Sequence, residues 1–77
     1  MKGYSYAIWD NVDKEFVSWS WTSFKKAKEE MMGYFNNQAL RILKVKDGVI
    51  RHECNRFVDK PTTHRIVNIT HAQSKLY

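Results

Sequence analysis

The sequence has one cysteine, Cys54, and one proline, Pro61, and it lacks any apolar run of 18 residues. A single cysteine excludes an intrachain disulfide and a four-cysteine metal cage. The missing apolar run excludes a membrane-spanning helix, and the first residues show no apolar stretch of the secretory kind. We therefore expect one small cytoplasmic domain over residues 1–77, with no membrane contact and no cofactor of its own.

Acidic residues are scarce in the second half of the chain. Residues 1–38 hold five lysines and five acids, whereas residues 39–77 hold eight Lys or Arg against three acids. The second half therefore carries the whole net charge of +5 and also all three histidines. Nine of the eleven aromatic residues lie in the first half. A basic half of this kind favours anionic partners, although the charge could also serve only solubility.

Two alternating segments near the N-terminus predict a β-hairpin. Residues 4–9 and 16–21 alternate large and small side chains, the two-residue period of a strand, around turn residues 10–14. Pairing Asp10 with Glu15 places six apolar side chains on one core face: Tyr4, Tyr6, Ile8, Val17, Trp19 and Trp21. The same register leaves Trp9 and Phe16 off the core, as an aromatic pair at the hairpin tip.

A helix is expected next, because apolar residues recur at helical spacing in the following segment. Thr22 or Ser23 supplies a hydroxyl that can cap its first turn. Ala27 and Met31 lie on the apolar stripe, and Gly33 is typical of the position just past a helix end.

A second hairpin over residues 40–54 turns at Asp47-Gly48, a pair typical of a type I′ turn. A two-residue loop places Lys44 opposite Arg51 and directs Leu43 toward the helix. A last strand over residues 65–70 and a polar tail over 71–77, expected to be flexible, complete the chain. The fold class is therefore α+β: one antiparallel sheet, in the order strand, strand, helix, strand, strand, strand, with one helix packed on one face.

The basic residues of the second half are the main candidates for a binding site. Seven of them are expected to contact nucleic acid, mainly at phosphate and sugar: Arg41, Lys44, Lys46, Arg51, Arg56, Lys60 and Arg65. Like charges opposite one another destabilise a sheet, so a polyanion would relieve the repulsion between Lys44 and Arg51. The alternative is a solvated sheet face with acids interleaved.

Other side chains are weaker candidates. Trp9 and Phe16 could stack on unpaired bases or contact a protein partner. His52, Cys54, His64 and His71 match none of the usual zinc spacings, so no metal site is expected. His52 and His64 could instead supply the acid and base of a metal-free ribonuclease.

The first half resembles the hybrid-binding domain found at the N-terminus of many ribonucleases H. The resemblance covers residues 4–42 and rests on a few short elements: Tyr6-Ala7-Ile8, Ser23-Phe24, Ala27-Lys28, Met31 and Gly33-Tyr34-Phe35. It implies that this sheet–helix unit can sit on an RNA-containing duplex, with Phe24 and Lys28 as contacts. Phe24 replaces the tryptophan of that family, and Asp47-Gly48 opens a hairpin where the family continues to a second helix.

These observations favour a small, non-enzymatic nucleic-acid-binding protein, with RNA preferred over DNA because no helix-turn-helix, zinc finger or basic zipper is visible. The first alternative is a regulator or inhibitor, of the kind that phages and mobile elements encode, which binds a host protein that can itself carry RNA. Homodimer formation fits the same aromatic content. The second alternative is the small metal-free ribonuclease.

Overall fold

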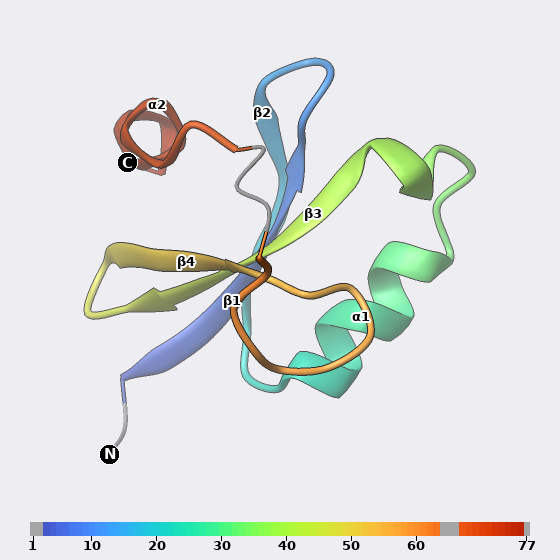
Figure 1. The fold of residues 1–77 in the computed structure, drawn as a ribbon, viewed down its shortest axis with the longest axis horizontal. Coiled ribbons are helices and arrows are strands. Elements are labelled where there is room, and N and C mark those ends of the chain that lie inside the picture. The colour runs from blue at the N-terminus through green and yellow to red at the C-terminus, as the bar shows by residue number, and fades with distance from the viewer. Residues whose placement is uncertain (1–2, 64–66, 77) are drawn as a thin grey trace.

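The computed structural model describes residues 3–63 and 67–76, and its centre is a four-stranded antiparallel sheet (Figure 1). The strands are β1 (Tyr4–Asp10), β2 (Glu15–Trp21), β3 (Leu40–Lys46) and β4 (Val49–Cys54), in the spatial order β2-β1-β3-β4. The helices are α1 (Phe24–Met32), a 3-10 turn η1 (Asn37–Ala39) and α2 (Ile69–Lys75). The expected α+β class, the antiparallel sheet and the order of the first five elements are confirmed.

The prediction of a last strand over residues 65–70 is wrong for residues 67–70. Ile69 and Thr70 begin α2, and His71 to Lys75 continue it, so a helix replaces both the end of that strand and most of the expected tail. The Asn68 side chain caps this helix by accepting a hydrogen bond from the His71 backbone N–H at 3.0 Å. An asparagine that precedes an amphipathic turn is a helix start, and the β-branched residues around it obscured that signal. Residues 65 and 66 lie outside the described part of the chain.

Each face of the sheet is covered by its own helix (Figure 1). On the α1 side, Ala27 and Met31 pack with Tyr6, Ile8 and other strand residues. On the α2 side, a second apolar cluster forms from residues of both hairpins, of α2 and of the segment just before it: Ala7, Trp9, Leu43, Val45, Ile50, Val67 and Ala72. Because both faces of the sheet are covered, its strands carry apolar residues on both sides. The sequence prediction had placed a helix on one face only.

Helix α1 begins and ends where the sequence indicates. The Ser23 hydroxyl caps it by accepting a hydrogen bond from the Lys26 backbone N–H at 3.1 Å, and the helix ends at Met32. Gly33 follows with φ −80°, so its left-handed freedom is not used at this helix end.

The first hairpin has the predicted register only near its turn. Asp10 pairs with Glu15 and Trp9 with Phe16, but Ile8 then pairs with Ser18 because a bulge intervenes. Ser20 adopts φ +73° beyond it, in a second irregularity. These bulges shift the strand by two residues at Tyr6, which pairs with Trp21 in place of Trp19. The side chain of Trp19, predicted to be core, is 58% exposed.

The second hairpin has its predicted turn, with φ +54° at Asp47 and +77° at Gly48, and Val45 pairs with Ile50 as expected. Arg51 then has no residue opposite, so Lys44 pairs with His52 and the rest of β4 moves by one position. The one-residue slip puts Cys54 on the same face as Ile42, on the α1 side, while Leu43 lies on the opposite face under α2.

No helix among the described residues is long and apolar enough to cross a membrane.

Candidate functional site

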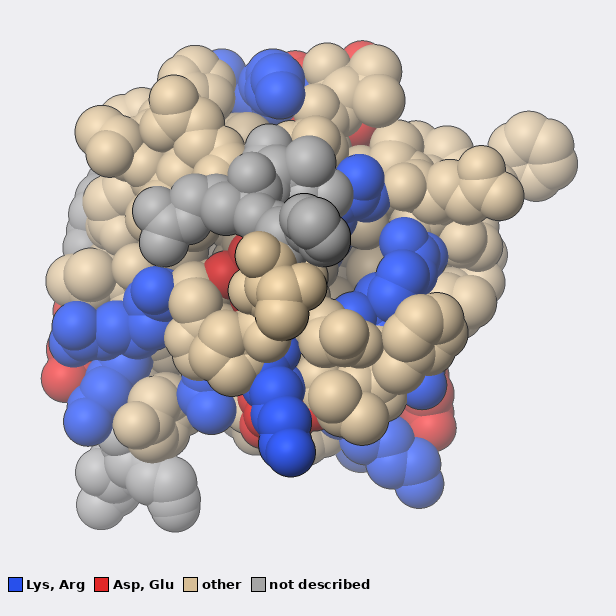
Figure 2. All heavy atoms as spheres, in the orientation of Figure 1, with Lys and Arg blue, Asp and Glu red and all other residues tan. Residues whose placement is uncertain are grey.

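A cationic cluster forms at the end of the sheet where β1 starts and the β3–β4 turn lies. Its five members line one open hollow of about 430 Å³: Tyr4, Lys44, Lys46, Arg51 and His52. Figure 2 shows Lys and Arg side chains at this end of the sheet and in several other groups across the same face. Three of the seven predicted basic residues, Lys44, Lys46 and Arg51, are therefore brought together.

The two lysines of the cluster lie against an aromatic ring. The Nζ atoms of Lys44 and Lys46 are 4.6 and 4.9 Å from the ring centroid of Tyr4, a distance at which an ammonium is attracted by the ring quadrupole. Antiparallel pairing of Tyr4 with Lys46 and of Tyr6 with Lys44 produces this arrangement. The Tyr4 side chain, 43% exposed, keeps part of its surface open to a ligand.

Gly3 fixes the approach of β1 to the β3–β4 turn. It has φ +73°, and a Cβ at this position would lie 2.6 Å from a carboxylate oxygen of Asp47. The Gly3 carbonyl accepts a hydrogen bond from the Asp47 backbone N–H at 3.2 Å. A larger residue would therefore push the Asp47 side chain aside and would be strained at this φ, directly before Tyr4.

One carboxylate balances the cluster from the loop that follows β4. Asp59 lies 3.7 Å from Lys44 Nζ and accepts a 2.6 Å hydrogen bond from the Tyr6 hydroxyl. Burial and the Asp59 carboxylate together raise the pKa of Tyr6, which stays a neutral donor. Within the described chain, Lys46 and Arg51 form no ion pair. The cluster therefore retains two cations without a carboxylate partner.

His52 is the titratable member of the cluster. Its Nε2 atom is buried and has no hydrogen-bond partner in the parts of the chain described here. Burial lowers the pKa of His52 below its usual 6.5, and the neighbouring Lys44 ammonium lowers it further. The imidazole is therefore neutral at pH 7 and can accept a hydrogen bond at one ring nitrogen.

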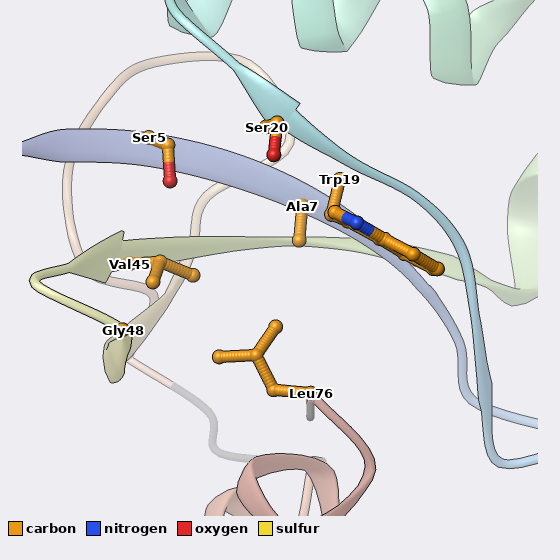
Figure 3. A pocket seen from close by; sticks show the side chains of 7 residues that line it. All are labelled: Ser5, Ala7, Trp19, Ser20, Val45, Gly48 and Leu76. Atoms are coloured by element: carbon orange, nitrogen blue, oxygen red, sulfur yellow. The ribbon is translucent and has the colours of Figure 1, made fainter.

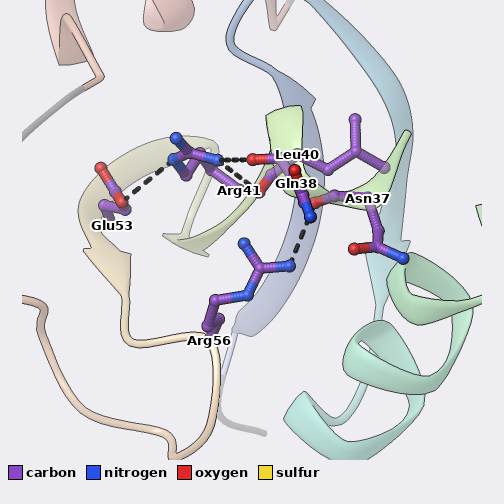
Figure 4. Close-up of polar contacts among 6 residues, drawn as sticks. All are labelled: Asn37, Gln38, Leu40, Arg41, Glu53 and Arg56. Carbon is purple, nitrogen blue, oxygen red and sulfur yellow. Dashed lines mark hydrogen bonds and ion pairs between the residues drawn. The ribbon is translucent and has the colours of Figure 1, made fainter.

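Two predicted contact residues, Arg41 and Arg56, instead have structural partners (Figure 4). Arg41 lies 3.8 Å from the buried carboxylate of Glu53 and donates to the Gln38 and Leu40 carbonyls. Arg56 donates to the carbonyl of Asn37 at 3.1 Å. These contacts join β3, β4 and the segment around η1, at the opposite end of β3 from the cluster.

The remaining predicted residues are scattered. Lys60 is exposed on the loop after β4, and Arg65 and His64 lie outside the described residues. Trp9 is 1% exposed and packs edge-on against Phe16 at 4.9 Å under α2, so it is not available for stacking on a base. Two aromatics that sequence reasoning assigned to the core, Tyr4 and Trp19, are exposed.

The residues singled out by the resemblance to the hybrid-binding domain also have partners. Phe24 packs edge-on against Tyr6, with ring centroids 6.0 Å apart. The Nζ atom of Lys28 lies 5.7 Å from the Phe57 ring. The expected absence of a metal centre is not tested by this arrangement, although no group of three potential ligands occurs in the described ranges.

A smaller hollow of about 210 Å³ lies between the sheet and the end of α2 (Figure 3). Leu76 points from the end of α2 toward the sheet, where Val45 and Ala7 face it, and Trp19 lies along the sheet beside them. This hollow lacks charged side chains, so it has no chemistry comparable with that of the cationic cluster.

Comparisons of the chain with protein-family models, with curated proteins and with solved structures find no match.

Proposed function

We propose that this protein binds nucleic acid without cleaving it, with RNA favoured, through phosphate and sugar contacts from the cationic cluster. The observation that carries the proposal is the convergence of Lys44, Lys46 and Arg51 on one hollow, with a single carboxylate, Asp59, paired to one of them. We place the protein in the cytoplasm, where RNA is available, as part of the same proposal.

Charge supplies the physical reason for a polyanion. Three cations on one patch repel one another, and a strand of phosphates would replace that repulsion with attraction. Binding would also release counterions condensed on the nucleic acid, which makes affinity fall as salt rises. The part-exposed Tyr4 ring adds a surface on which an unpaired base can stack.

The preference for RNA rests on His52 and on the shape of the molecule. A neutral imidazole accepts a hydrogen bond from a ribose 2′-hydroxyl, a group that DNA lacks. Both helices cover the sheet, and α1 carries lysines and glutamates side by side, which does not suit insertion into a DNA major groove. The resemblance to the hybrid-binding domain favours an RNA-containing ligand as well.

The test is fluorescence anisotropy with labelled single-stranded RNA, duplex RNA, RNA–DNA hybrid and duplex DNA of equal length, at about 50 and 200 mM salt. We expect micromolar or tighter binding, strongest for RNA, that weakens steeply with salt. No binding at the lower salt refutes the proposal. The same samples, held in a metal chelator and run on a gel, should show intact RNA; cleavage would favour the ribonuclease hypothesis.

A protein partner is the second candidate function, and exposed apolar side chains favour it. Met32, Phe35, Phe57 and Val58 are between 48% and 106% exposed, along the end of α1 and the loop after β4. Exposed apolar residues of this size are typical of interaction surfaces. Size-exclusion chromatography with light scattering at several concentrations should detect a homodimer. If a Phe57→Ser variant has the same mass in solution as the unaltered protein, this surface is not the dimer interface.

A further inference from the structure

A separate hollow of about 310 Å³ lies between the start of α2 and the β1–β2 hairpin. Four residues line it: Trp9, Lys14, Asn68 and His71. It is on the α2 face of the sheet and at the end of β1 opposite Tyr4, so it is distinct from the cationic cluster. Its volume is at the lower end of the range for small-molecule sites.

Trp9, one of the lining residues, has an unsatisfied hydrogen-bond donor. Its side chain is 1% exposed, and its Nε1–H is buried without a hydrogen-bond partner among the residues that the structure describes. A buried indole N–H ordinarily finds an acceptor, because leaving it unpaired is costly. An acceptor atom of a ligand in the hollow could satisfy it.

The other lining groups are also suited to an acceptor-rich ligand. Asn68 uses its side-chain oxygen to cap α2, which leaves its amide nitrogen as the donor. Lys14, whose backbone lies in the β1–β2 turn with φ +59°, contributes an ammonium. None of the described residues that line the hollow carries a carboxylate. The indole of Trp9 and the imidazole of His71, edge-on with centroids 6.1 Å apart, provide aromatic surface.

We propose that this hollow binds a small organic acid: a carboxylate on an aromatic or aliphatic body. The carboxylate lies near Lys14 and accepts hydrogen bonds from Asn68 and from Trp9 Nε1, and the body packs on the aromatic rings. Because Nε1 is closed to solvent, a neighbouring side chain must turn to admit the ligand. His71 is exposed, and its ring has no hydrogen bond to any described residue. It is therefore the side chain that moves.

The test uses benzoate as the probe and the indole N–H signals of the three tryptophans in ¹⁵N–¹H correlation spectra. Single Trp→Phe variants assign the signals. Trp21 serves as an internal reference, because its Nε1 already donates to the Ser18 hydroxyl at 2.8 Å. We expect benzoate to shift the Trp9 signal selectively, with saturation at about millimolar concentrations, as befits a ligand of this size. Benzyl alcohol, with the same ring and no charge, and inorganic phosphate, with charge and no ring, should both bind more weakly.

Matched charge variants separate this site from a general effect of positive charge. Lys14→Gln should weaken benzoate binding about threefold, the scale of one exposed ion pair. Lys25→Gln, which removes an exposed lysine of α1 outside the hollow, should leave it unchanged. The proposal is overturned if benzoate leaves the Trp9 signal in place up to about 20 mM, if benzyl alcohol binds as well as benzoate, or if both lysine variants have the same effect. RNA binding by the cationic cluster is measured separately and does not bear on this result.

Discussion

Removing Lys46 and Arg51 together should reduce the salt dependence of RNA binding by a calculable amount. Each phosphate contact with a single strand contributes about 0.7 to the slope of log affinity against log salt. If Lys44, Lys46 and Arg51 each neutralise one phosphate, the slope is about −2.1, and affinity falls about 18-fold between about 50 and 200 mM salt. With only Lys44 left, the slope becomes about −0.7 and the fall about 2.6-fold.

The assay is fluorescence anisotropy of a labelled single-stranded RNA across a salt series. Its control is Lys25→Gln with Lys26→Gln, which changes the net charge from +5 to +3 as the test variant does. Both control lysines are exposed on α1. We expect the control to keep nearly the full slope. If it loses as much slope as Lys46→Gln with Arg51→Gln, binding depends on net charge alone, and the assignment of a site to the cluster is refuted.

Four further predictions follow from particular contacts. Arg41→Gln should lower the free energy of unfolding by about 2 kcal/mol in urea denaturation, because it removes the ion pair with Glu53 and the hydrogen bonds to the carbonyls of Gln38 and Leu40; a loss no larger than that of an exposed-lysine variant would contradict this. The His52 proton signals should titrate below pH 6.5, and because an imidazolium cannot accept a bond from a 2′-hydroxyl, the preference for RNA over DNA should shrink as the pH falls from about 7.5 to 5.5; an unchanged preference would show that His52 does not contact the 2′-hydroxyl. Burial raises the pKa of Cys54 to about 12, so at pH 8 its thiol should react with an aromatic disulfide about a thousandfold more slowly than in urea; equal rates would show that the site is open. Gln73→Ala should speed hydrogen exchange along β4, because the Gln73 amide bonds both a backbone N–H and a carbonyl of that hairpin; unchanged exchange would mean that α2 does not protect this edge.

Local signals predicted the elements well where short-range chemistry decides them. The Asp47-Gly48 turn, the Ser23 cap and the Asp10–Glu15 pair all form as expected, because each depends on residues close together in the chain. A type I′ turn needs only two residues that accept positive φ. The α+β class follows from these elements.

The registers were not predictable in the same way. A bulge needs no special residue, and each one in this sheet moves later side chains to new partners. The extra residue at Arg51 changed the predicted pair Lys44–Arg51 into Lys44–His52. The slip also places Cys54 on the face of Ile42, whereas the regular register places it on the face of Leu43.

The strand register also decided which residues of the cationic cluster could be predicted from the sequence. Lys44, Lys46 and Arg51 were predicted because they lie close together in one hairpin, and they do converge. The contribution of Tyr4 depends on pairing between β1 and β3, which the alternating pattern alone does not specify. Trp9 was misplaced because α2, which covers it, was taken for a strand.

The central claim is that RNA contacts the cationic cluster, and the most direct test is a ¹⁵N–¹H titration of the whole chain with a short single-stranded RNA at about 50 mM salt. We predict that the largest backbone shifts occur at Tyr4, Lys44, Lys46, Arg51 and His52, while the signals of α2 stay in place. Absence of shifts, or shifts confined to α2 or to the end of α1, would contradict the account.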